Sequence, residues 1–276
     1  MDKIFIKYVL FSITVLTFFD KQVNISAISV QQFLSLSFQE KTALDQFRAK
    51  VEPILENNCM RHDTYLIRWL RARNFDINAA DRMLRENLRW RKENKIDNIK
   101  YEDFKDMESD YPYTIDTYDK IGQPIGALDI SEWDLRRAVL EGKSSRYNRY
   151  TVALVENITG QVCERQRKGM NVTQVVVLLY ADGLNVVQQV CPICIPLWIQ
   201  FVTVMENYYA EWIDEFIVID ASPTVEILLN VLRPLFSRNT RNAVKVFGHD
   251  RKKWMAHLDN KISRSERGKE YGGIKP

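Results

Sequence analysis

The sequence contains residues that could support catalysis, but they lack the spacing that common active sites require. It has no G-x-S-x-G nucleophile elbow, no G-x-x-x-x-G-K-[ST] or G-x-G-x-x-G phosphate loop, and no H-E-x-x-H zinc motif. None of the four cysteines is followed six residues later by the Arg of a cysteine phosphatase. Asp182 and Asp220 end two apolar runs, where carboxylates more often cap helices or form turns. We therefore expect no enzyme, no catalytic residue, no metal and no cofactor.

The cysteines could instead bind zinc or act in redox chemistry. The sequence places them at Cys59, Cys163, Cys191 and Cys194, and the last two form a C-x-x-C pair. A zinc site would need a second ligand pair, which the three histidines do not supply. A reactive cysteine should be partly exposed, whereas Cys191 and Cys194 lie among apolar residues. We expect buried thiols on an apolar turn.

The N-terminus leaves the compartment open. Lys3 and Lys7 precede an uncharged run of 12 residues from Tyr8 to Phe19, shorter than the ~20 residues of a membrane-spanning helix. The run suits the apolar region of a signal peptide, with cleavage near Ser26 or Ala27. The alternatives are a frayed amphipathic anchor or upstream sequence wrongly joined to the gene. The sequons at Asn24, Asn157 and Asn171 occur at near-chance frequency and decide nothing.

The chain divides into three parts by pattern. We expect a doubtful hydrophobic leader over 1–30, a helical lobe over 31–100 and an α/β lobe over 101–276. In the helical lobe, Ser37 and Glu40 form a capping box ahead of a periodic segment. The pattern predicts helices over 38–56 and 63–73, and a third that begins at Asp76 or Asn78.

From residue 113 onward, strands alternate with helices. We predict strands over 114–118, 125–130, 173–182, 215–220 and 243–247. We predict helices over 193–209, 225–236 and 250–259, and one long helix or two abutting ones over 134–168. The near-continuous apolar runs 175–181 and 216–219 are typical of strands buried on both faces of a parallel sheet. The fold class is therefore α/β with a mostly parallel sheet.

Two segments carry more apolar residues than one buried helix face requires. Within 225–236, only Glu226, Asn230 and Arg233 are polar or charged, and the segment 197–205 is similarly apolar. Helices of this kind are buried on two sides or cover an apolar cavity. An ordinary core helix is the commoner explanation, and a pocket for a lipid-type ligand is the alternative.

Several ordered motifs resemble the CRAL-TRIO lipid-binding family over about residues 36–273. They are Leu66-Ile-Arg-Trp-Leu-Arg-Ala-Arg-Asn-Phe-Asp76, Tyr180-Ala-Asp-Gly-Leu184, Glu206-Asn-Tyr-Tyr-Ala-Glu211, Phe216-Ile-Val-Ile-Asp-Ala-Ser-Pro223, Leu232-Arg-Pro-Leu-Phe236 and Glu270-Tyr-Gly-Gly273. The chain is most similar to the animal branch that includes supernatant protein factor (tocopherol-associated protein). Relatives in that branch usually carry a C-terminal GOLD β-sandwich, which we do not find after Gly273.

The resemblance implies a pocket that encloses a single lipid behind a mobile gate at about Pro223–Phe236. It implies a lipid ligand such as a phospholipid, tocopherol, retinoid or sterol-like molecule, transient contact with a membrane surface, and no nucleic acid. It implies binding and transfer or presentation of that lipid; the alternative is a lipid-sensing module that regulates signalling or trafficking without transfer. The expected ligand-binding residues are Leu128, Val176, Leu178, Tyr180, Phe201, Met205, Tyr208, Glu211, Ile217, Ile219, Val225, Leu228, Leu229, Leu232 and Phe236.

The positions that would recognise a phosphoinositide head group depart from the family pattern. Asn74 and Ala243 replace two expected lysines, and only Glu211 is retained. Arg238, Arg241 or Lys245 are possible substitutes. Tyr180 also replaces the family's usual Asp. Because phosphate recognition relies on cationic donors, a neutral ligand is favoured.

Charge predicts little about other partners. The chain has 39 Lys and Arg against 36 Asp and Glu, a net charge of +3. Basic residues outnumber acidic ones between 61 and 95, which could attract anionic lipids. The alternatives are surface ion pairs such as Arg82–Glu86, and packing of Arg68 and Arg71 between the lobes. We expect a monomer in the cytoplasm with transient membrane association; the alternative is a chain that is secreted, or anchored through residues 1–27.

Overall fold

The computed structural model describes residues 33–275. The predicted leader and the N-terminal anchor fall on residues outside that range. Among the described helices, none is both long enough and apolar enough to cross a bilayer.

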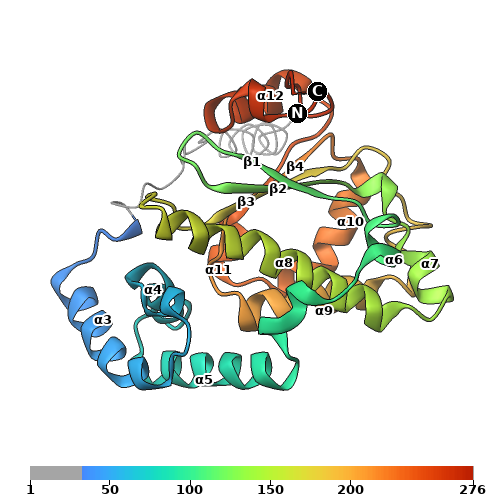
Figure 1. Cartoon of the computed structure of the whole chain (residues 1–276). Coiled ribbons are helices and arrows are strands. Elements are labelled where there is room, and N and C mark those ends of the chain that lie inside the picture. The colour runs from blue at the N-terminus through green and yellow to red at the C-terminus, as the bar shows by residue number, and fades with distance from the viewer. Residues whose placement is uncertain (1–32, 276) are drawn as a thin grey trace, which may run out of the picture.

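The N-terminal lobe is helical, as its periodicity predicts (Figure 1). Ser37 and Glu40 form the predicted capping box: Glu40 N–H donates to Ser37 Oγ at 3.2 Å, and Ser37 N–H donates to Glu40 Oε2 at 2.8 Å. The first helix is shorter than predicted because Pro53 starts a 3₁₀ turn after it. Asp76, rather than Asn78, caps the third helix by accepting from Ala79 N–H at 2.9 Å. The elements are α3 (Phe38–Val51), η1 (Glu52–Ile54), η2 (Asn58–Arg61), α4 (Asp63–Ala72), α5 (Ile77–Glu93) and η3 (Ile96–Tyr101).

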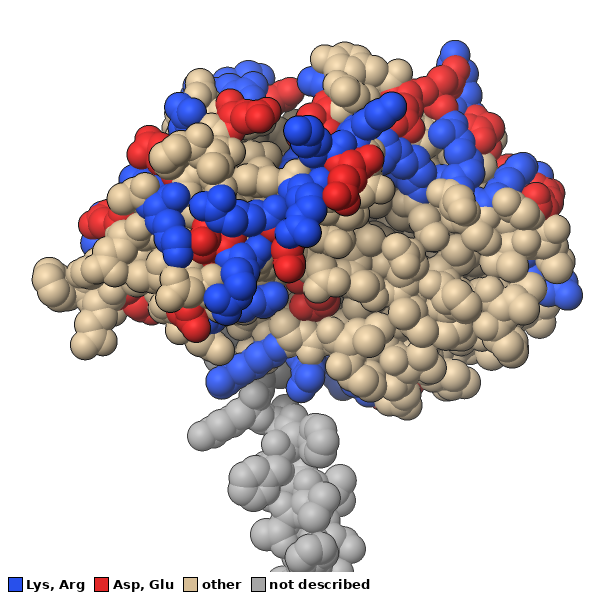
Figure 2. All heavy atoms as spheres, turned by 90° about the horizontal axis from the view of Figure 1, so that it is seen from below, with Lys and Arg blue, Asp and Glu red and all other residues tan. Residues whose placement is uncertain are grey.

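One face of this lobe is rich in basic side chains. Figure 2 shows Lys and Arg gathered on the side where α5 lies, next to a broad uncharged surface. Arg82, Arg89 and Lys92 are exposed on α5, and Arg85 pairs with Asp81 at 2.8 Å. Surface ion pairs therefore neutralise only some of the basic side chains on this face.

The second lobe is an α/β layer around a five-stranded sheet in the order β1-β2-β3-β4-β5. The first pair is antiparallel and every other pair is parallel, as the sequence predicts. Gly122, at φ +88°, makes the tight turn between the antiparallel strands. The strands are β1 (Thr114–Tyr118), β2 (Pro124–Asp129), β3 (Val175–Tyr180), β4 (Ile213–Ile219) and β5 (Val244–Val246).

Helices cover both faces of the sheet. In Figure 1, α8 and α9 lie on one side and α12 lies on the other. The predicted helix over 134–168 is two helices, because the chain turns at Gly142, which has φ +70°. The elements are α6 (Lys105–Glu108), η4 (Ile130–Glu132), α7 (Leu135–Leu140), α8 (Ser144–Arg167), α9 (Ile195–Tyr208), α10 (Pro223–Leu232), η5 (Arg233–Leu235), α11 (Arg238–Ala243), α12 (Arg251–Lys261) and η6 (Arg264–Glu266).

A buried ionic cluster attaches α12 to the sheet. Lys261 Nζ lies 2.6 Å from Asp214 Oδ2 and 3.5 Å from Glu215 Oε1, and His257 Nε2 lies 2.7 Å from Glu215 Oε2. Burial acts to raise the pKa of Glu215, but the hydrogen bond with His257 and the charge of Lys261 outweigh it. The pKa of Glu215 is therefore lower than the ordinary carboxyl value.

This cluster predicts acid sensitivity. A carboxyl with a lowered pKa in the folded state stabilises the fold above its ordinary pKa of 4.5, and that stability is lost as the pH falls through the folded-state pKa. Urea unfolding across pH 3–7 should show the loss below about 4.5. Glu215→Gln should lower the unfolding free energy by about 1–3 kcal/mol at pH 7 and flatten the acid limb.

The exposed Glu226→Gln, which loses only a surface pair with Arg233, is the control and should behave like the wild type. If the unfolding free energy of Glu215→Gln varied with pH as that of the wild type does, Glu215 would not be the source of the acid sensitivity.

Candidate ligand-binding pocket

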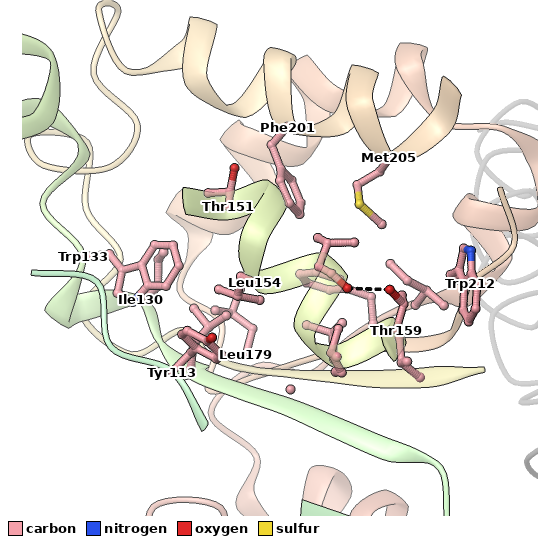
Figure 3. Close-up of a pocket in the computed structure, with 18 of the residues that line it drawn as sticks. Tyr113, Ile130, Trp133, Thr151, Leu154, Thr159, Leu179, Phe201, Met205 and Trp212 are labelled. Atoms are coloured by element: carbon pink, nitrogen blue, oxygen red, sulfur yellow. Dashed lines mark hydrogen bonds between the residues drawn. The ribbon is translucent and has the colours of Figure 1, made fainter. Parts of the chain in front are cut away.

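An apolar pocket lies between the sheet and the helices α8 and α9 (Figure 3). Its empty centre measures about 90 Å³, well below the ~300–1,000 Å³ of pockets that hold drug-sized ligands. A lipid-sized molecule would therefore enter only if the walls moved apart. The lining residues are Tyr113, Gly126, Leu128, Ile130, Trp133, Tyr147, Thr151, Leu154, Val155, Ile158, Thr159, Val175, Val177, Leu179, Leu197, Trp198, Phe201, Met205, Trp212, Ile213 and Phe216.

Three polar side chains in this wall are already paired with backbone carbonyls of the protein. Thr151 Oγ1 donates to Asn148 O at 2.9 Å and Thr159 Oγ1 donates to Val155 O at 2.7 Å. The indole N–H of Trp198 donates to Gln189 O at 2.8 Å. Burial raises the pKa of Tyr147, so its phenol stays neutral. Since the lining has no charged residue among the described ones, a charged group placed here would lack a partner and would be costly to bury.

Strand β3 supplies one wall through alternate residues. Val175, Val177 and Leu179 line the pocket, whereas Val176 and Leu178 belong to a solid cluster with Trp254 and other α12 residues. Val176 is fully buried and Val177 is only partly buried, although they are neighbours in a central strand. The difference follows from the pleat: one face of the sheet packs on a helix, and the other faces the cavity.

The structure brings three of the expected ligand-binding residues to this pocket, namely Leu128, Phe201 and Met205. Five others lie in the cluster on the opposite face of the sheet: Val176, Leu178, Tyr180, Ile217 and Ile219. The sequence analysis missed Val175, Val177 and Leu179, the alternate residues of β3 that line the pocket. A run that is apolar at every position does not show which of its two faces meets a cavity. The sequence analysis also missed the contribution of helix α8 to the pocket. The α8 residues Leu154, Val155 and Ile158 line the pocket opposite the sheet.

The expected gate residues lie beside the pocket. Val225, Leu228, Leu229, Leu232 and Phe236 are buried in the same core cluster as Leu179 and Leu197. They are absent from the wall of the empty space. Helix α10 thus contributes to the core beside the pocket, and a ligand-contacting role for its residues stays a prediction.

The last two expected residues lie at the junction of the lobes. Tyr208 stacks on Trp90 with ring centroids 4.2 Å apart. The Glu211 carboxylate accepts a hydrogen bond from the amide of Asn239. Burial raises the pKa of Glu211, against the opposing charge of Arg71. Neither residue lines the pocket.

Asp182 and Asp220 take the structural roles that the sequence favoured. Asp182 is exposed and accepts a long hydrogen bond of 3.5 Å from Tyr180 OH. Asp220 sits at a turn with φ +51° and accepts from Trp254 Nε1 at 3.4 Å. They do not belong to the pocket wall.

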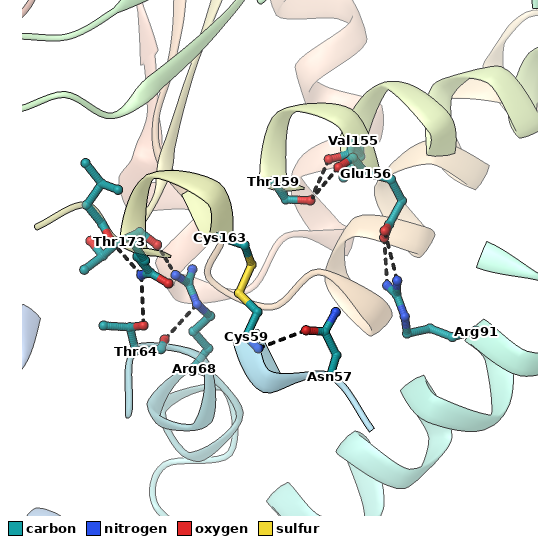
Figure 4. Close-up of a disulfide and its surroundings, with 12 residues drawn as sticks. Asn57, Cys59, Thr64, Arg68, Arg91, Val155, Glu156, Thr159, Cys163 and Thr173 are labelled. Atoms are coloured by element: carbon teal, nitrogen blue, oxygen red, sulfur yellow. Dashed lines mark hydrogen bonds and ion pairs between the residues drawn. A yellow bond between two sulfur atoms is a disulfide. The ribbon is translucent and has the colours of Figure 1, made fainter. Parts of the chain in front are cut away.

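Arg68 fixes the N-terminal lobe to the pocket wall (Figure 4). Its guanidinium is buried and donates to the main-chain carbonyls of Thr64 at 2.9 Å, Glu211 at 2.8 Å and Thr173. It also lies 3.9 Å from the ring centroid of Trp212, a lining residue. Burial lowers the pKa of Arg68 to about 9, so the group stays charged at neutral pH. The packing of Arg68 between the lobes, one of our alternatives, is confirmed.

Disulfides correct the expectation of free thiols. Cys59 on η2 pairs with Cys163 on α8 with a Cα–Cα distance of 5.8 Å (Figure 4). Cys191 pairs with Cys194 with a Cα–Cα distance of 5.0 Å. Cys59, Cys191 and Cys194 are buried, as the apolar surroundings of the C-x-x-C predicted. The sequence did not predict the Cys59–Cys163 pair, because the two cysteines are 104 residues apart. They meet only because the two lobes pack together.

The pocket predicts opposite outcomes for two neighbouring substitutions. Val177→Phe should fill the cavity and weaken binding of a hydrophobic fluorescent probe by at least about tenfold, or 1.4 kcal/mol. Val176→Phe, its control on the packed face, should instead overpack the core and cost about 1–3 kcal/mol of unfolding free energy. Wild-type probe affinity in a folded Val177→Phe would contradict the pocket.

Comparisons with known proteins agree with this architecture. Residues 108–273 match the CRAL/TRIO domain family model. "Protein real-time" of Aedes aegypti is 26% identical over 216 residues, which cover 77% of this chain and 33% of that protein. "Phosphatidylinositol/phosphatidylcholine transfer protein SFH9" of Arabidopsis thaliana is 24% identical over 245 residues, 85% of this chain and 41% of that one. The chain thus spans about a third to two fifths of these relatives' length.

A solved structure supports the same fold. The crystal structure of Sfh5 superposes with a TM-score of 0.69 at 13% identity, covering 86% of this chain and 88% of that one. At this identity the match concerns the fold. The family model covers more than half of the chain, from the end of α6 to the C-terminal turns. This chain therefore belongs to the CRAL/TRIO domain family.

Proposed function

We propose that this protein binds one hydrophobic lipid in the pocket between the sheet and helices α8 and α9, and transfers or presents it at membranes. The observation that carries the proposal is a largely apolar wall with no charged residue among those described, in which Thr151, Thr159 and Trp198 already bond to backbone carbonyls. Such a wall favours hydrophobic burial, at roughly 25 cal/mol per Å² of apolar surface. A relative in the same family is named as a phospholipid transfer protein.

A neutral ligand fits the chain better than an inositol phospholipid. The pocket wall contains no charged residue among those described, and Asn74 and Ala243 occupy the positions where the resemblance leads one to expect lysines. Glu211 is engaged with Asn239. A tocopherol-, retinoid- or sterol-like molecule would need few hydrogen bonds, whereas a phosphate would need cationic donors that these positions lack.

Helix α10 is suited to act as the gate. Its inner residues are buried in the core cluster beside the pocket, while Ile227 is 53% and Val231 is 40% exposed on its outer side. Leu235 in η5 and Ile199 on α9 are also exposed, and α10 contacts both η5 and α9. An apolar outer face would be stabilised by contact with lipid. Because the closed cavity is small, movement of this helix at a membrane would let a ligand enter.

The basic face of α5 would support docking. Arg82, Arg89 and Lys92 are exposed there, next to the uncharged surface (Figure 2). Lysines and arginines near an anionic membrane contribute about 1 kcal/mol each. We propose that the cationic face orients the protein while the apolar face enters the bilayer surface.

Purified protein should contain a lipid. Native mass spectrometry should show one bound molecule that organic extraction releases. The protein should also move a fluorescent tocopherol or sterol analogue between vesicles faster than it moves phosphatidylinositol. Binding without transfer would favour the lipid-sensing module instead, and failure to bind any lipid would overturn the proposal.

The outer face of α10 can be tested separately from the pocket. Ile227→Asp should slow vesicle-to-vesicle transfer by about tenfold, because it places a charge on the face that meets the bilayer. Probe affinity and stability should change little, as expected for an exposed position. Phe38→Asp is the matched control, since Phe38 is 88% exposed on α3 in the other lobe. Equal transfer rates for both variants would refute the gate assignment.

A further inference from the structure

All four cysteines of the sequence are paired in the structure, which leaves no free cysteine. The Cys59–Cys163 bridge is the more informative, because it joins the N-terminal lobe to α8 across 104 residues. Disulfides persist in oxidising compartments and are rare in the cytosol, where thiol-based reductants keep cysteines reduced. Complete pairing in a chain of this size therefore indicates where the protein folds.

The loop after α8 contains a sequon whose Asn171 is exposed, whereas Val172 and Thr173 are buried. Transfer of a sugar to Asn171 would therefore precede the folding of this segment. Asn171-Val172-Thr173 follows Gly169, whose φ of +78° turns the chain away from the helix. Lys168, Gly169, Met170 and Asn171 are all exposed. Within the described part of the chain, the Asn171 side chain makes no hydrogen bond to another residue, so a glycan on its amide nitrogen would displace no such contact.

The other sequon within the described residues differs. Asn157 is exposed in the middle of α8, and its Nδ2 donates to Tyr113 OH at 3.1 Å. Tyr113 lines the pocket. A sugar on this nitrogen would crowd a contact that supports the pocket wall. Asn171 therefore offers the better-suited position.

We infer that this chain folds in an oxidising compartment, where Asn171 receives an N-linked glycan. Each disulfide forms when two thiols give up two protons and two electrons to a disulfide oxidant, which is reduced to a dithiol. In the glycan transfer, Asn171 Nδ2 loses one proton and bonds to the anomeric carbon of an oligosaccharide. The bond from that carbon to a lipid diphosphate breaks, the lipid diphosphate leaves as an anion with the electron pair of that bond, and the proton from Asn171 Nδ2 passes to water.

The position of Asn171 is compatible with lipid exchange. The C-terminal end of α8 lies against the N-terminal lobe, where Gln166 Nε2 donates to Thr64 Oγ1 at 3.1 Å. Figure 1 places α10 toward the other side of the α/β lobe. A glycan on the loop would project into solvent away from the apolar outer face of α10. The inference is independent of the proposed lipid ligand, because it concerns only the cysteines and this loop.

The test is expression of the full chain, with its own N-terminus, in cultured insect cells. We expect no alkylation of cysteine without a reductant, and four alkylated cysteines after reduction. Peptide-N-glycosidase F should shift the protein mass and convert Asn171 to Asp, which peptide mapping of the unaltered chain detects. Asn171→Gln should abolish the glycan at this position, and Asn157→Gln should leave it.

Two results would overturn the inference. One is a purified chain with cysteines that alkylate without reduction. The other is an unmodified Asn171, whether or not a sugar is found at another sequon. Because mapping uses the unaltered chain, a folding defect in a variant does not affect the conclusion.

Discussion

The structure depends on a sheet whose two faces are buried in different ways. On one face, Val176 and Leu178 are buried in a cluster with Trp254 and Leu258 of α12. On the other, Val177 and Leu179 face a cavity below α8 and α9. The pleat alternates side chains between these faces, so a single strand contributes both to the solid core and to the pocket. One face of the sheet therefore belongs to the core, and the other lines the cavity.

Helix α8 is kept in place by the other lobe. Cys163 is bonded to Cys59, and Arg91 makes a two-point ion pair with Glu156, with N–O distances of 2.7 and 2.9 Å. Arg68 holds the chain segments that lead into β3 and β4. These ties fix the pocket wall made by α8 and the sheet. Movement that admits a lipid would therefore fall to α10, whose buried side contacts the core through apolar packing.

The surface has a basic region on one helix and an apolar region on another. Cations gather on α5, while exposed Ile227 and Val231 lie on the outer side of α10. In a lipid carrier, such a surface would combine orientation by charge with insertion by apolar contact. A glycan at Asn171 would stay clear of both functions. Helix α8 serves two roles, because it carries both pocket-lining residues and Cys163 of the interlobe disulfide.

The sequence by itself determined the fold class, the order of the elements and the family. For the fold class and the order of the main elements, local signals sufficed: the Ser37–Glu40 capping box, the apolar runs of β3 and β4, and the periodicity of α4 and α5. The family was inferred from the ordered motifs between Leu66 and Gly273 that resemble it. Element ends moved by a few residues where Pro53 and Gly142 intervened.

Only the tertiary structure decided which residues line the pocket and which cysteines pair. A strand buried on both faces has the same apolar pattern whichever parity meets the cavity, so Val177 could not be distinguished from Val176 by sequence. Cys59 and Cys163 meet only because the lobes dock. Local patterns specify which face or element is apolar, whereas the empty space and the long-range bond depend on how distant elements pack together.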